Sequence, residues 1–119
     1  MDKNTKEKLE IMIEAIKNKI KPNKKILFGS FAKGTQKEDS DIDICVITDY
    51  NKRKIDMLRE LRLSTIGKID IPMDIVIYGN TEFSQRAEKE NTFENQINKE
   101  GVLLWKSSVF IASNPQKNI

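Results

Sequence analysis

Residues 29–43 read GSFAKGTQKEDSDID, and this stretch decides how the rest of the chain is interpreted. A Gly-Ser pair opens it, ten residues follow, and Asp41-Ile42-Asp43 closes it. An apolar run over 24–28 precedes the Gly-Ser pair, and a second run, rich in β-branched residues, continues from the two aspartates. The pattern predicts a strand over 24–28, a helical turn over 30–33 and a strand over 41–48.

Amphipathic and alternating patterns on both sides of this stretch predict the other elements. Upstream, apolar residues at helical spacing predict a helix over 5–20, with Asn4 and Glu7 as a capping box and Pro22 beyond its end. Downstream, the predicted elements are a helix over 51–66 ended by Gly67, a strand over 69–78, a helix over 81–89 capped by Thr81, a helix opened by Asn91 that runs to Gly101, and a strand over 102–105.

The order of these elements predicts an α/β (α+β) fold in which helices pack against a mixed β-sheet. The chain has 119 residues, a length that suits one domain with one hydrophobic core. We expect this domain to cover residues 1–106 and the Ser/Asn-rich residues 107–119 to form a flexible tail.

The composition restricts the chemistry that the domain can perform. The chain contains no histidine and a single cysteine, Cys45. This excludes Ser-His-Asp and Cys-His catalysis, histidine-ligated zinc and an internal disulfide. Acid-base work falls to Asp, Glu, Lys or Tyr, and any metal site must be built from oxygen ligands, which favour Mg²⁺ or Mn²⁺.

Charge and hydropathy narrow the possible partners and location. A net charge of +3 is too small to indicate a nucleic-acid-binding protein. No apolar run approaches the ~20 residues that cross a bilayer, and the lysine-rich start carries no secretory signal. With the lone cysteine, these features favour a cytoplasmic protein. Residues 36–49 nevertheless carry one lysine against five acidic residues, in and around an apolar strand.

Three aspartates form the candidate catalytic and metal-binding set. Alternation along a strand places Asp41 and Asp43 on one face, about 6.5–7 Å apart. Asp74 lies within the third predicted strand and joins them if the two strands are neighbours. Carboxylates so close repel one another, whereas divalent cations keep them ionised. Three carboxylates can hold two ions about 3.5–4 Å apart, the arrangement used in phosphoryl and nucleotidyl transfer.

The Gly-Ser pair supplies a candidate phosphate site. Gly29 lets the backbone approach an anion and adopt a positive φ. Backbone N–H groups at the start of the turn can point at phosphate oxygens, and the Ser30 hydroxyl and the Lys33 ammonium add a donor and a charge. Each feature alone is common in ordinary turns and strands, but no ordinary structural role explains the ordered combination.

These residues resemble the signature of the DNA polymerase β-type nucleotidyltransferase superfamily, and the short chain resembles its minimal nucleotidyltransferases, often one half of HEPN/MNT toxin–antitoxin pairs. The resemblance covers about residues 5–105. Gly34, Ser40, Asp74 and the ending over 100–105 also match. Lys33 stands where relatives often have arginine, which keeps the charge but loses bidentate geometry.

The resemblance implies a polymerase β-like fold and a reaction that uses two Mg²⁺ ions, with Mn²⁺ as an alternative. Asp41 and Asp43 would bind both metals, and Asp74 would complete the second metal's shell and help to deprotonate the attacking hydroxyl. Gly29 and Ser30 would hold the β/γ-phosphates, with Lys33 and Ser40 completing the nucleotide site. An acceptor hydroxyl would attack the α-phosphate of ATP and release pyrophosphate.

The acceptor is not written in the sequence. The resemblance implies a HEPN-type toxin, modified with AMP on a hydroxyl such as that of tyrosine, so that the chain acts as an antitoxin. A binding-only antitoxin that blocks its partner sterically is one alternative. Nucleotidyl transfer to a small molecule such as an aminoglycoside is another.

Overall fold

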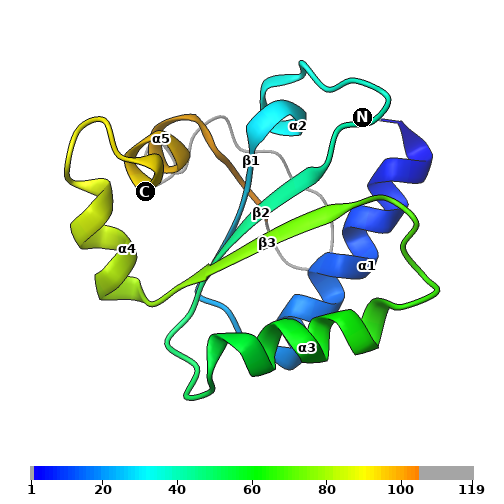
Figure 1. Cartoon of the computed structure of the whole chain (residues 1–119), viewed down its shortest axis with the longest axis horizontal. Helices are drawn as coiled ribbons and strands as arrows, with labels where there is room; N and C mark the ends of the chain where they lie inside the picture. The colour runs from blue at the N-terminus through cyan, green and yellow to red at the C-terminus, as the bar shows by residue number, and fades with distance from the viewer. Residues whose placement is uncertain (1, 105–119) are drawn as a thin grey trace.

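A computed structural model describes residues 2–104, and the predicted tail lies outside the described residues (Figure 1). The predicted order of helices and strands is confirmed. In chain order the elements are α1 (Lys3–Lys19), β1 (Lys24–Phe28), α2 (Gly29–Lys33), β2 (Ile42–Ile47), α3 (Lys54–Thr65), β3 (Met73–Tyr78), α4 (Asn80–Ala87), α5 (Phe93–Glu100) and β4 (Val102–Leu103).

The strands form one mixed sheet in the order β3-β2-β1-β4. Strand β1 pairs antiparallel with both β2 and β4, whereas β2 and β3 are parallel. Parallel neighbours need a crossover connection, and α3 provides it between β2 and β3. The mixed sheet with helices confirms the predicted fold class.

Helices cover both faces of the sheet (Figure 1). Buried residues of α1 and α3 pack with Ile42, Ile44 and Val46 of β2 on one face. On the other face, residues of α4 and α5 pack with Cys45 and Ile47, which alternate along β2 with the three residues just named. Burying one such aliphatic side chain contributes about 1.5–3 kcal/mol. The alternation also assigns Asp43 to the face of α4 and α5.

Three predicted helix caps are wrong, each by one or two residues, and α3 begins at Lys54, three residues later than predicted. Asp2, not Asn4, caps α1, because its carboxylate accepts the backbone N–H of Thr5 at 2.7 Å. Thr92, not Asn91, caps α5, because its hydroxyl accepts the N–H of Asn95 at 3.0 Å. Helix α4 begins after Gly79, before the predicted cap Thr81. Several capping residue types stand near each helix start, and the sequence alone does not rank them.

Strand β3 is shorter than predicted. It begins at Met73, so the alternating residues 69–72 are not a strand. Pro72 has no N–H to donate, although its carbonyl accepts the N–H of Ile42 at 2.9 Å. Ile69 and Ile71 are half-buried against the core of α1 and α3, which explains the apolar pattern without strand geometry. Within residues 2–104, no helix is both long and apolar enough to cross a membrane.

Candidate active site

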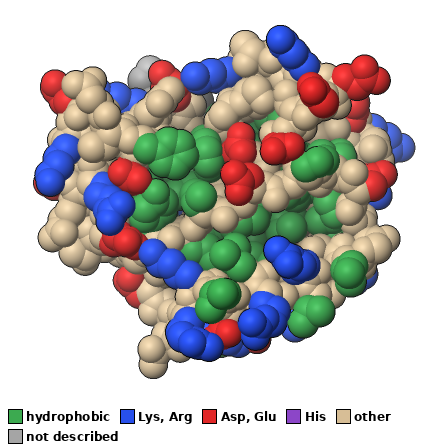
Figure 2. All heavy atoms as spheres, in the orientation of Figure 1, with side chains coloured by type: hydrophobic (Ala, Val, Ile, Leu, Met, Phe, Trp, Pro, Cys, Tyr) green, Lys and Arg blue, Asp and Glu red, His purple; other side chains and the backbone are tan. Residues whose placement is uncertain are grey.

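Two of the three predicted aspartates lie side by side on neighbouring strands. In the parallel register of β2 and β3, Asp43 is paired with Asp74. Adjacent strands lie about 4.7–4.9 Å apart, so the two side chains leave the same face of the sheet as neighbours. Asp41 precedes β2 by one residue and is exposed. Figure 2 shows acidic side chains gathered near the centre of this face of the molecule, beside hydrophobic ones.

Asp43 is the least exposed of the three aspartates, and its pKa is raised by its surroundings. Burial raises the pKa of the Asp43 carboxyl, and the negative charges of Asp74 and then Asp41 raise it further. A bound cation would reverse this effect and favour the ionised carboxylates.

Gly29 lies directly against Asp43. Its φ of +74° is in the left-handed region, which glycine adopts without strain. A Cβ at this position would overlap the Asp43 carboxylate. The end of β1 brings the two together, because Phe28 is paired with Asp43 in the antiparallel register. The Gly-Ser turn and the carboxylates thus meet in space although ten residues separate Ser30 from Asp41.

The other predicted nucleotide-binding residues, Ser30, Lys33 and Ser40, each make a different contact within the protein. Ser30 lies in α2, and its carbonyl accepts the N–H of Gly34, which ends this short helix at a φ of +73°. The ammonium of Lys33 forms an ion pair with Glu100 of α5 at 3.2 Å. The hydroxyl of Ser40 accepts the backbone N–H of Lys37 at 2.7 Å, so in this structure it stabilises the loop before β2.

Not every residue of the acidic segment belongs to this group. The two carboxylate oxygens of Asp49 accept the backbone N–H of Asn80 at 3.0 Å and its side-chain N–H at 2.6 Å. These hydrogen bonds lower the pKa of Asp49. Asp49 follows the far end of β2 and holds the start of α4, which is a structural role.

The donor set fits a hard divalent cation, although the carboxylates are not gathered around one point. Within residues 2–104, no group of three His, Cys, Asp or Glu side chains is arranged to hold a metal ion. Asp43 and Asp74 are neighbours on rigid strands, while Asp41 is exposed at the end of a loop, where its side chain can reorient at little cost. Oxygen-only ligands suit Mg²⁺ or Mn²⁺.

A pocket of about 270 Å³ opens beside Asp43 on the same face of the sheet. Its apolar lining comes from Phe28, Phe93 and Ile97, and we call it the aromatic pocket. Its other lining residues are Gly29, Lys33, Asp43, Gln96 and Glu100. The part of this lining that α5 contributes was not predicted from the sequence. The available signal was Phe93, an aromatic residue at the first position of a polar helix.

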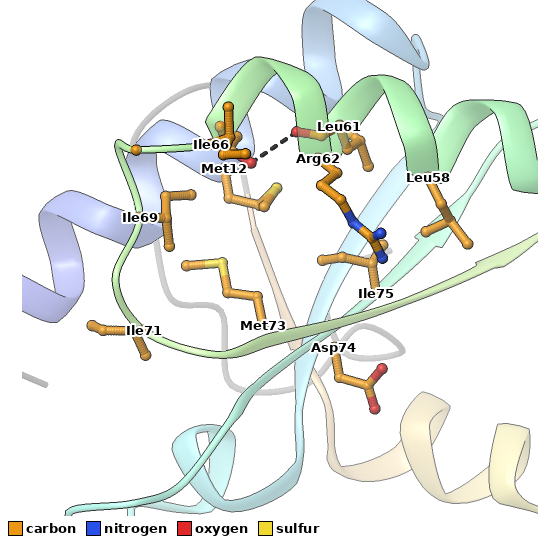
Figure 3. A pocket seen from close by; sticks show the side chains of 12 residues that line it. Met12, Leu58, Leu61, Arg62, Ile66, Ile69, Ile71, Met73, Asp74 and Ile75 are labelled. Atoms are coloured by element: carbon orange, nitrogen blue, oxygen red, sulfur yellow. Dashed lines mark hydrogen bonds between the residues drawn. The ribbon is translucent and has the colours of Figure 1, made fainter.

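A second hollow, of about 420 Å³, lies between α3 and the edge strand β3. Figure 3 shows Met73 and Ile75 pointing toward α3, whereas the Asp74 carboxylate points away from them. Asp74 therefore touches this groove but does not direct its charged group into it. Asp43 lines the aromatic pocket, whereas Asp74 lines the edge of this groove with its carboxylate turned away from it.

A family model described as "Polymerase beta, Nucleotidyltransferase" matches residues 10–109, which is more than half of the chain. The chain belongs to this nucleotidyltransferase family. The match includes the Gly-Ser turn and all three aspartates. The four-stranded mixed sheet and its helices are therefore a nucleotidyltransferase domain.

Solved structures give two further comparisons for this nucleotidyltransferase. One chain, from a crystal structure of a toxin–antitoxin with AMP-PNP, is 26% identical over 87% of this chain and 73% of that chain, with a TM-score of 0.57. Another, from a Sulfolobus solfataricus protein assigned to the nucleotidyltransferases, is 19% identical over 89% and 90% of the two chains, with a TM-score of 0.48. With a TM-score below 0.5, the second likeness supports no conclusion about this chain. No curated protein sequence matches the chain significantly.

Proposed function

We propose that this nucleotidyltransferase transfers AMP from ATP to a hydroxyl of a partner protein, a HEPN-type toxin, and thereby acts as its antitoxin. The observation that carries the proposal is the pairing of Asp43 with Asp74 against Gly29, on a domain of the nucleotidyltransferase family. The toxin–antitoxin structure with AMP-PNP, which resembles this chain, supports both the nucleotide and the kind of partner.

In this proposal, Asp41, Asp43 and Asp74 hold two Mg²⁺ ions, with Mn²⁺ as a substitute. When bound, such ions would neutralise phosphate charge and would make the acceptor hydroxyl more acidic. The N–H groups of Gly29 and Ser30 hold the β/γ-phosphates at the start of α2, and Lys33 adds a positive charge. Ser40 orders the loop that leads to Asp41, and so contributes to the nucleotide site indirectly.

The proposed reaction forms one bond and breaks one. The acceptor oxygen bonds to the α-phosphorus, and the bond from that phosphorus to the bridging oxygen of pyrophosphate breaks. Asp74 accepts the hydroxyl proton. Positioning and charge neutralisation supply the catalysis, which is consistent with a chain that contains no histidine.

We place the reaction in the cytoplasm, where ATP is abundant and thiols stay reduced. Cys45 is buried, and burial raises its pKa to about 12, so this thiol is neither a nucleophile nor a disulfide partner.

Protection of cells tests the proposal. The chain is co-expressed with a HEPN-type toxin, as wild type and as Asp43→Asn. We expect wild type to restore growth and Asp43→Asn to fail while still folding and binding the partner. Full protection by Asp43→Asn would indicate a binding-only antitoxin. A partner that is not toxic would redirect the search to other acceptors, including small molecules.

A further inference from the structure

The aromatic pocket shares its lining with the proposed phosphate and metal site. Gly29, Lys33 and Asp43 contribute to both. A group bound in the pocket is therefore within reach of a nucleotide whose phosphates lie at the Gly-Ser turn. This inference rests on the proposed function and concerns a part of ATP to which that proposal gives no position.

The apolar lining suits a flat aromatic group. The rings of Phe28 and Phe93 meet edge to face, with centroids 5.5 Å apart and planes at 83°. Phe93 is nevertheless 50% exposed. An edge-to-face contact leaves the broad face of one ring uncovered, and an aromatic ligand can stack on such a face. Ile97, which is buried, closes the apolar side of the pocket.

The size of the pocket suits part of a nucleotide. Pockets that enclose a whole drug-sized ligand measure about 300–1,000 Å³, whereas this one measures about 270 Å³. A nucleobase with part of its ribose would fill it, and the triphosphate would extend along the polar lining toward Gly29. We propose that the aromatic pocket binds the adenine ring of ATP, stacked on Phe93.

The polar lining of the pocket contains an ion pair that bound phosphates would disrupt. Lys33 and Glu100 form their ion pair across the pocket, from α2 to α5. Both side chains are about half exposed, so the pair is weakly held. Arriving phosphates would compete with Glu100 for Lys33. Gln96, whose side chain donates to Glu100 at 3.3 Å, carries the donor and the acceptor that can pair with the edge of a purine.

Equilibrium dialysis of the full chain with Mg²⁺, without any partner, tests the proposal. The two probes are ATP and inorganic tripolyphosphate, which has the phosphates but no base. The variant is Phe93→Leu, which keeps apolar bulk but removes the ring. The control is Tyr50→Leu, at an aromatic residue that is 40% exposed and lies outside the aromatic pocket.

We expect Phe93→Leu to weaken ATP binding about 5- to 150-fold, the range that corresponds to one base–aromatic stack. Its affinity for tripolyphosphate should match wild type, and its melting temperature should fall only slightly, because the edge-to-face contact with Phe28 is lost. Tyr50→Leu should bind both probes normally.

Unchanged ATP binding by Phe93→Leu would overturn the assignment of the aromatic pocket to the adenine ring but would leave the proposed function standing. An aromatic side chain of the acceptor would then be the other candidate for the pocket. Equal weakening of both probes would also overturn it, because Phe93 would then support the fold or the phosphate site. A wild type that binds neither probe would refute the proposed function itself.

Discussion

Gly29 and Gly34 make a matched pair that separates backbone strain from damage to the site. Their φ angles are +74° and +73°, so alanine should strain both backbones equally. A Cβ at Gly29 would overlap the Asp43 carboxylate, whereas a Cβ at Gly34 would meet no atom within 4 Å. The left-handed conformation costs a non-glycine residue about 1–2 kcal/mol. We therefore expect Gly34→Ala to lose about 1–2 kcal/mol of stability, or about 4–10 °C in melting temperature, and Gly29→Ala to lose at least as much.

Only Gly29→Ala should change nucleotide binding. Its methyl group would push the Asp43 carboxylate out of position and occupy the space that a phosphate needs. The assay is thermal unfolding of both variants, followed by equilibrium dialysis with ATP and Mg²⁺. We expect Gly34→Ala to bind ATP like wild type and Gly29→Ala to lose at least tenfold in affinity. Equal affinities in the two variants would refute the close approach of Gly29 to the functional carboxylates.

Three further predictions concern single side chains. Asp43→Asn should stabilise the metal-free protein at pH 7 by about 0.2–1 kcal/mol, the size of a cross-strand like-charge repulsion. Because the pKa of Asp43 is raised in the folded state, this gain in stability should vanish below the ordinary carboxyl pKa of 3.8. A stability gain that persists below that pH in thermal melts would contradict the prediction. Tyr78→Phe should cost about 1–3 kcal/mol in urea unfolding, since its hydroxyl donates at 2.6 Å to Glu94, which is 8% exposed; a neutral result would show that Glu94 has another adequate donor. Glu100→Gln should release Lys33 and tighten ATP binding by about 2- to 5-fold, the value of a surface ion pair, and weaker binding would mean that Glu100 positions Lys33.

The sequence predicted the central strands well because their signals are local. The runs that end before Gly29 and begin after Asp41 each have a turn at one end, and the second is rich in β-branched residues. Gly34 ends α2 in the left-handed conformation, as expected. The strand predicted over 69–72 is wrong for a physical reason. Two half-buried isoleucines reproduce the alternation of a strand, but Pro72 prevents a strand from forming there.

The long-range pairing could be inferred only in part. The sequence placed Asp74 beside Asp43 on the condition that their strands were neighbours, and the parallel register of β2 and β3 meets that condition. The docking of α5 against β1 was not predictable, since no local pattern indicates which helix packs near Phe28. For that reason the aromatic pocket and the Lys33–Glu100 ion pair emerged only from the structure.

Intact mass spectrometry is the most direct test of the central claim. The chain is mixed with the HEPN-type toxin that it protects cells against, with ATP and Mg²⁺, and the masses of both proteins are measured. We predict that the partner gains the mass of one or more adenylyl groups, that pyrophosphate is released in equal amount, and that Asp43→Asn abolishes both. A partner that stays unmodified in the presence of wild type, while cells remain protected, would contradict nucleotidyl transfer to the partner.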